Sequence, residues 1–155
     1  MKSDNLLRHI WVPFLIAVLV YVFFYTGIEH RRTRKGPWEV AFTNNAAGTP
    51  TLVINQPSLT ISNLQITFPG ESNALASQNA TVELSQPRDV PYPVPFGKCV
   101  FMDTTFLPGT IVFDLFGHEI QLIPRALRID GKEIPWQSNA TIPVAGTNAM
   151  EMQRR

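Results

Sequence analysis

The side chains that could carry metal or redox chemistry are few and far apart in the sequence. Cys99 is the only cysteine, and His118 is the only histidine beyond residue 30. A copper centre needs histidine, cysteine and methionine ligands together, and a Rieske cluster or covalent haem needs two cysteines. A structural zinc site needs four such ligands. We therefore expect no metal site and no cofactor of the chain's own.

Two pairs of polar residues are candidate catalytic groups. His118 and Glu119 stand side by side like a base and a carboxylate, but adjacent strand residues point to opposite faces. We therefore interpret them as solvated residues of a turn. Asp103 and Asp114 would form a carboxylate pair, or a cation site, only if their strands were neighbours. Acidic residues at strand edges are common, so this is the less favoured interpretation.

No known hydrolase or nucleotide-binding motif accompanies these residues. The sequence holds no Gly-x-Ser-x-Gly, no His-Glu-x-x-His and no glycine-rich phosphate loop. Cys99 lies in an apolar run and is interpreted as a small core residue, with a reactive thiol as the alternative. We expect no catalytic residues and no enzymatic activity, although an enzyme of an unrecognised kind is a third hypothesis.

The element that must position everything else is an apolar N-terminal segment. No charged side chain occurs from residue 10 to residue 28. Nineteen helical residues span roughly 28 Å, close to the ~30 Å hydrocarbon core of a bilayer. A signal peptide is the alternative, but its apolar core is shorter and ends in a small-x-small site, which this segment lacks. We predict a transmembrane helix, with Pro13 in its first turn, anchored by Ile10, Trp11, Phe14, Leu15, Leu19, Phe23, Phe24 and Ile28.

A basic collar follows the predicted helix. It contains Arg31, Arg32, Arg34 and Lys35, against Lys2, Arg8 and the amino terminus on the other side. Positive charge favours the cytoplasmic side, so we expect the rest of the chain in the cytoplasm, with a periplasmic or extracellular location as the alternative. The collar is also suited to anionic lipid headgroups.

After Gly36-Pro37 the apolar residues alternate with polar ones, which predicts half-buried strands. Asp130-Gly131 and Phe116-Gly117 mark hairpin turns. Eight or so short strands predict a mainly β chain, with a small antiparallel β-sandwich or barrel after the helix. The expected parts are a polar tail (1–9), the transmembrane helix (10–28), the collar (29–36), the β-rich domain (37–145) and a C-terminal tail (146–155).

Two segments interrupt the alternation. Residues 71–80 are rich in Ser, Asn, Ala and Gln, and residues 86–98 are rich in proline. A proline-rich stretch tends toward polyproline II, so we expect a crossover that does not pair into a sheet. The alternative is a docking strip whose partner contacts are Tyr92, Pro93, Pro95 and Phe96.

In layout, the chain resembles the H subunit of purple-bacterial photosynthetic reaction centres. The shared features are the apolar segment 10–28, the basic collar 31–35 and the strands after Trp38. That family has one N-terminal transmembrane helix and a cytoplasmic β-rich domain that covers its partners. The resemblance is confined to this layout, and it implies a bioenergetic or photosynthetic complex.

These features predict a non-enzymatic single-pass membrane subunit that stabilises a larger membrane complex. Its expected partners are membrane lipids and other integral membrane subunits, with lipid or pigment contact at the helix. With 13 basic and 12 acidic side chains, the chain is not expected to bind nucleic acid. The alternative is a stand-alone membrane-anchored envelope domain that binds a ligand, peptide or glycan.

Overall fold

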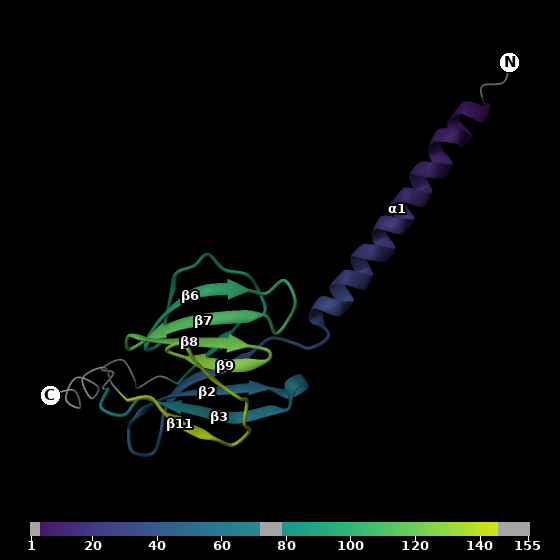
Figure 1. Cartoon of the computed structure of the whole chain (residues 1–155). Helices are drawn as coiled ribbons and strands as arrows, with labels where there is room; N and C mark the ends of the chain where they lie inside the picture. The colour runs from purple at the N-terminus through teal and green to yellow at the C-terminus, as the bar shows by residue number, and fades with distance from the viewer. Residues whose placement is uncertain (1–3, 72–78, 146–155) are drawn as a thin grey trace. The chain divides into compact units, whose positions relative to one another are not determined.

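A computed structural model describes residues 4–71 and 79–145 of the chain (Figure 1). The chain separates into two units, residues 1–34 and residues 35–155, and each is treated by itself. Most of the polar segment predicted at 71–80 and the whole C-terminal tail predicted at 146–155 lie outside the described residues.

The first unit is one long helix, α1 (Asp4–Thr33). It begins earlier than the predicted polar tail allowed and ends later than the uncharged segment, so Pro13 lies inside the helix and not in its first turn. The helix extends past the apolar segment because its last turn is suited to cations: Arg31 and Arg32 lie at the negative end of the helix dipole. Arg32 also pairs with Glu29 at 2.9 Å.

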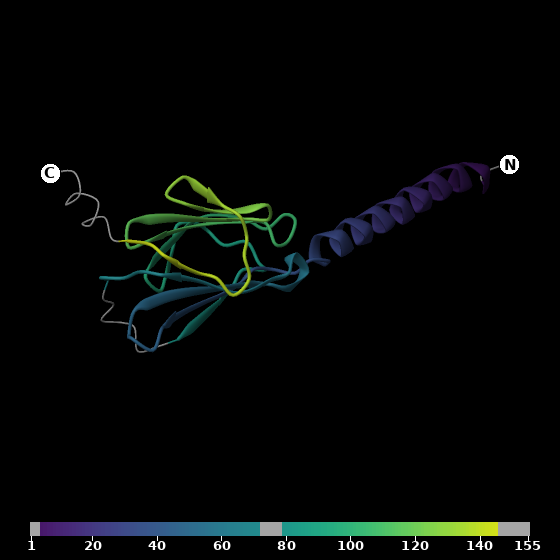
Figure 2. The same cartoon turned by 60° about the horizontal axis from the view of Figure 1, so that its bottom comes forward.

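The second unit is a sandwich of two sheets, and the mainly β fold predicted from the sequence is confirmed (Figure 2). Sheet A has the order β11-β3-β2-β1-β4 and sheet B the order β10-β9-β8-β7-β6-β5. Sheet A contains β1 (Glu39–Asn44), β2 (Pro50–Gln56), β3 (Ile61–Thr67), β4 (Ala80–Glu83) and β11 (Thr141–Pro143). Sheet B contains β5 (Tyr92–Val94), β6 (Gly97–Asp103), β7 (Thr110–Leu115), β8 (His118–Ile123), β9 (Ala126–Ile129) and β10 (Lys132–Ile134).

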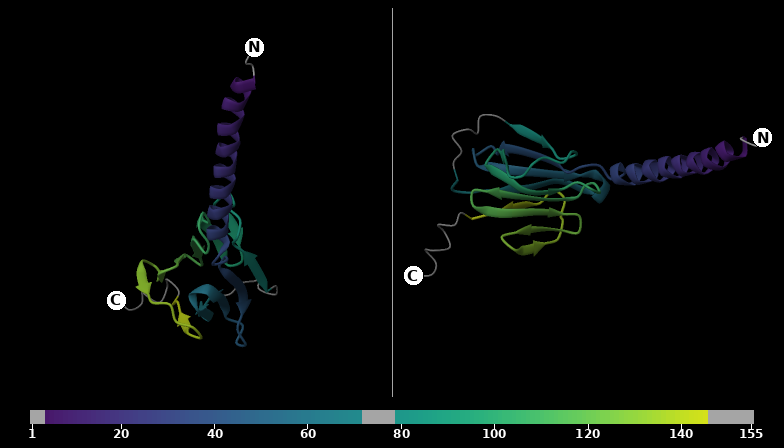
Figure 3. Two further views of the ribbon diagram at one scale, coloured as in Figure 1. Left: turned by 90° about the vertical axis from the view of Figure 1, so that its right-hand side faces the viewer. Right: turned by 90° about the horizontal axis from the view of Figure 1, so that it is seen from above.

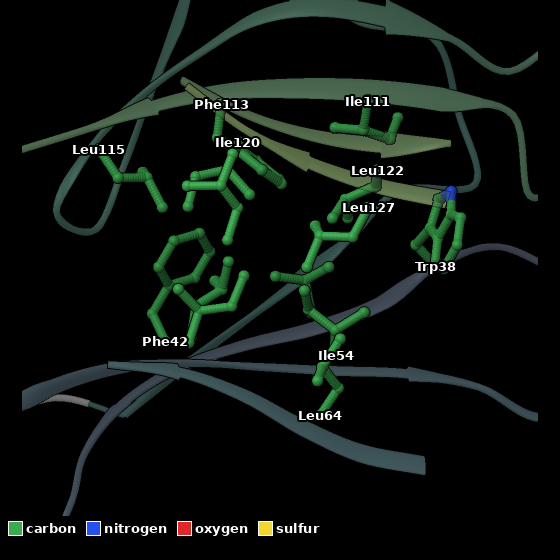
Figure 4. Packing of buried hydrophobic residues seen from close by; sticks show 14 of the residues in the cluster. Trp38, Phe42, Ile54, Leu64, Ile111, Phe113, Leu115, Ile120, Leu122 and Leu127 are labelled. Atoms are coloured by element: carbon green, nitrogen blue, oxygen red, sulfur yellow. The ribbon is translucent and has the colours of Figure 1, made fainter. Parts of the chain in front are cut away.

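The core lies between the two sheets, where the apolar members of the alternating pattern meet (Figure 4). In β7 every second residue is buried, which follows from the two-residue period of a strand with one face on a core. Trp38, Phe42, Phe68 and Phe113 are the largest of these side chains and are at most 1 % exposed. Fully burying each apolar side chain stabilises the fold by roughly 1.5–3 kcal/mol, so this layer is the main source of stability.

The sandwich has two distinct ends (Figure 3). At the proximal end, where the chain arrives at Lys35, the Trp38 indole donates a hydrogen bond to the Gly109 carbonyl at 3.0 Å. Gln56 donates to the carbonyls of Gly36 and Pro37, and Ser58, in the short 3-10 helix η1 (Pro57–Leu59), donates to that of Lys35. The distal end carries the β5–β6, β7–β8 and β9–β10 turns.

Two expectations about the sheets need correction. The proline-rich segment does pair: β5 is antiparallel to β6, with Tyr92 opposite Cys99. It can do so because β5 is an edge strand, whose outer side needs no N–H donors. The second exception is β11, which runs parallel to β3 because the chain crosses between sheets at the proximal end, where β3 also begins.

Candidate functional site

The predicted membrane anchor is the most exposed apolar surface in the part of the chain that the structure describes. It contains a candidate membrane span, His9–Arg32, whose most apolar 18-residue window has a mean hydropathy of 2.1, and none of that window is buried. This helix is long and apolar enough to cross a membrane. The predicted anchor residues Ile10, Trp11, Phe14, Leu15, Leu19, Phe23, Phe24 and Ile28 are 56–75 % exposed.

The basic collar is divided between the helix end and the start of the β domain. Arg31 and Arg34 are exposed, while Arg32 is half-buried in its ion pair with Glu29. Lys35 is exposed, and its carbonyl is held by the Ser58 hydroxyl at 2.8 Å. The collar therefore offers three exposed cations at the point where the chain leaves the helix.

The four predicted partner contacts lie in two different settings. Pro93 is exposed on the edge strand β5, and Tyr92 and Pro95 are half-buried. Phe96, also half-buried, turns back onto the core at the distal end, where its ring stacks on Phe116 with centroids 5.4 Å apart. The two turns are joined further by the Phe116 N–H, which donates to the Phe96 carbonyl at 3.2 Å.

Tyr92 and Cys99 face each other inside sheet B. The thiol is fully buried, as expected for a core residue, and its sulfur lies 3.4 Å from the Phe101 carbonyl. Burial raises the pKa of the Cys99 thiol, and burial together with the adjacent thiol raises the pKa of the Tyr92 hydroxyl. Because a thiolate is the reactive form of cysteine, this arrangement disfavours nucleophilic chemistry.

His118 is not the solvated turn residue that the sequence suggested. It is the first residue of β8 and is 6 % exposed, whereas Glu119 points to solvent on the other face. Its Nδ1 lies 2.7 Å from an oxygen of Asp130 in the β9–β10 turn. The second Asp130 oxygen accepts the Glu119 N–H at 2.9 Å, so Asp130 ties the start of β8 to the turn.

The His118–Asp130 pair resembles a catalytic base that is oriented by a carboxylate, but a substrate cannot reach the imidazole. The other ring nitrogen, Nε2, is buried and has no hydrogen-bond partner among the described residues. The ring of Phe68 packs against the imidazole. A general base must reach the proton it removes, so this closed arrangement serves the structure of the distal end. Sequence reasoning missed Asp130; the Asp-Gly turn was the only available signal.

The two other carboxylates do not meet. β6 and β7 are neighbours, but Asp103 is opposite Thr110 and Asp114 is opposite Lys98, at the other end of the pair. The Asp103 carboxylate accepts the Thr105 N–H at 3.0 Å, which lowers its pKa, and Asp114 lies 3.5 Å from the Lys98 ammonium. Within residues 4–71 and 79–145, no group of three or more His, Cys, Asp or Glu side chains is placed to hold a metal ion.

Comparison with known proteins does not add a family to this description. No family model, no curated protein and no solved structure matches the chain.

Proposed function

We propose that this protein is a non-enzymatic, single-pass membrane subunit that stabilises a larger membrane complex. The observation that carries the proposal is the helix α1, whose apolar window is left entirely uncovered. Such a surface needs a lipid environment, and a helix in lipid also offers side chains to neighbouring helices. The β domain would then brace partner proteins on one side of the membrane.

The polar side chains that could act as catalytic groups are engaged within the β domain, which supports a binding role over a catalytic one. His118, Asp103 and Asp114 each engage a neighbour within the fold, as described above. The proposal includes the cytoplasmic side for the β domain, on the strength of the collar, and a bioenergetic or photosynthetic complex, on the layout resemblance.

Gentle extraction of the tagged full-length protein from its native membrane into polymer-bounded discs tests the proposal. We expect it to migrate with other integral membrane proteins, which mass spectrometry would identify. Pigment-bearing subunits among them would support a photosynthetic complex. A lone monomer would contradict the proposal and favour the stand-alone envelope domain.

A matched variant separates anchoring from recognition. Replacing residues 10–28 by an unrelated apolar helix of the same length keeps the anchor and removes the side chains that partners would contact. If the helix recognises partners, the variant stays in the membrane but no longer co-migrates with them. Alanine at His118, Asp103 and Asp114 should leave the assembly in place.

A further inference from the structure

The exposed apolar side chains of the β domain come from one edge of sheet B and the loop that follows its strand β6. Among the described residues outside α1, the large apolar side chains that are exposed are Val90, Phe101 and Phe106. Phe101 lies on β6, and Val90 precedes β5, which pairs with β6. Phe106 is the most exposed, at 62 %, and lies in the β6–β7 loop at the proximal end. We call these three residues the apolar corner.

The loop that carries Phe106 is firmly built. The next residue, Leu107, is buried and anchors the loop to the domain. Gly109 packs so closely that a Cβ there would lie 1.9 Å from the Asp103 carbonyl oxygen, and its own carbonyl accepts the Trp38 indole N–H. Phe106 is therefore held outward by a fixed loop directly beside the first residues of the domain.

The length of the chain limits how far this end can be from a bilayer that α1 crosses. From Ile28 to Thr33 the chain is helical and two residues later it reaches Lys35, a total reach of about 15 Å. The headgroup layer alone is roughly 5–8 Å deep. Because the Lys35 carbonyl accepts a hydrogen bond from the Ser58 hydroxyl of the domain, a helix that crosses the bilayer with Ile28 at the edge of the hydrocarbon core would bring the proximal end to the headgroups.

The charges at the proximal end differ between the two sheets. Arg125, in the neighbouring β8–β9 turn of sheet B, is exposed. The Asp103 carboxylate beside the Phe106 loop is directed back at the loop's own Thr105 N–H. The exposed Glu39 and Glu83 lie opposite each other in sheet A. An anionic membrane surface would attract the sheet B side and repel the sheet A side.

We propose that the apolar corner, led by Phe106, inserts into the headgroup region of the same membrane that α1 crosses. Aromatic side chains partition to this depth, and nearby cations reinforce the contact with anionic lipid. The inference rests on the proposed membrane anchor. It gives the β domain a defined tilt, with sheet B toward the lipid.

Spin labels in full-length protein test the contact. In a Cys99→Ala background, labels are placed at Thr105→Cys beside Phe106, at Ala46→Cys in the distal β1–β2 turn and at Ile16→Cys in the helix. The discs contain phosphatidylcholine and phosphatidylglycerol. We expect the ratio of oxygen to nickel-chelate accessibility to be several-fold higher at position 105 than at 46, and to fall to the value at 46 when Phe106→Ser is added.

Each other outcome overturns the inference in an identifiable way. Equal ratios at positions 105 and 46, with the position 16 label in lipid, refute the lipid contact and leave the anchor intact. Shielding of position 105 from both reagents would mean that protein covers the loop. An aqueous label at position 16 refutes the anchor and the lipid contact together.

Discussion

At the scale of single residues, the groups that looked reactive are used to hold the fold together. The buried Cys99 and the half-buried Tyr92 form one cross-strand pair, and His118 and Asp130 join a strand to a turn. Buried polar groups of this kind are costly to leave without partners. Their removal should therefore change stability before it changes any activity.

The buried thiol gives a pH-dependent prediction. Because the pKa of Cys99 is raised above its ordinary value of 9.0, the unfolded chain loses this proton first as the pH rises. The contribution of the thiol to stability is complete below about pH 9 and is lost as the pH rises through the higher folded pKa. Urea unfolding, followed by tryptophan fluorescence in mild detergent, should show falling stability above pH 9.

Cys99→Ala is the matched variant for that measurement, since it removes the titrating group. Its unfolding free energy should decline less between pH 9 and pH 10. In the native protein at pH 8, a thiol reagent should react with Cys99 far more slowly than in urea. Equal rates in the two states would contradict the buried thiol.

Asp130 provides a second prediction at this scale. Asp130→Ala removes the carboxylate that holds the His118 ring and the Glu119 N–H, and should lower the free energy of unfolding by about 1–3 kcal/mol. Glu133→Ala is the control, because its ion pair with Arg128 is exposed and is worth less than about 1 kcal/mol. Similar losses in the two variants would show that Asp130 is no more than a surface acid.

At the scale of elements, the Gly109 turn connects the start of the chain's β domain to sheet B. Gly109 and Gly48 both have positive φ angles, of 70° and 78°, but only Gly109 is packed against backbone. Gly48→Ala should cost roughly 1–2 kcal/mol from the left-handed conformation alone. Gly109→Ala should cost clearly more, because the added Cβ collides with Asp103. Urea unfolding of the two variants side by side measures the difference.

The helix gives another prediction at this scale. Leu19 lies near the middle of the apolar window and is 61 % exposed. Leu19→Arg would place a charge at the bilayer centre, at a cost of about 2.5–3.5 kcal/mol, and should reduce the fraction that resists alkaline carbonate extraction. His9→Arg, at the end of the window, should have little effect because its side chain reaches the headgroups. Equal extraction of both variants would argue against a spanning helix.

Local signals in the sequence predicted the elements well. The Asp130-Gly131 and Phe116-Gly117 turns have positive φ at both residues, as such hairpins require, and the strands beside them were predicted. The features that the sequence did not predict depend on contacts between separate segments of the chain. β11 pairs with β3, which lies near the start of the β domain, and Asp130 lies beside His118 only when β8 and β9 are paired. The register that separates Asp103 from Asp114 is likewise fixed by the whole sheet.

At the scale of the whole molecule, two separate sets of basic residues would face the proposed membrane. In the proposed topology, the collar after α1 keeps the β domain on the cytoplasmic side, and Arg125 would favour one tilt of the domain against the lipid. Both depend on α1 crossing the bilayer, so topology is the property on which the proposals converge.

Topology is measured by labelling a single cysteine on the domain surface. Ala46→Cys in a Cys99→Ala background exposes one thiol at the distal end, where Ala46 is exposed. With the β domain in the cytoplasm, a membrane-impermeant maleimide should label this cysteine only after the cells are permeabilised. Changing Arg31, Arg34 and Lys35 to glutamine weakens the collar and should raise the labelled fraction in intact cells, because fewer cations then oppose translocation. Labelling of the parent in intact cells would place the domain outside, and the collar would then serve as a lipid contact on that face.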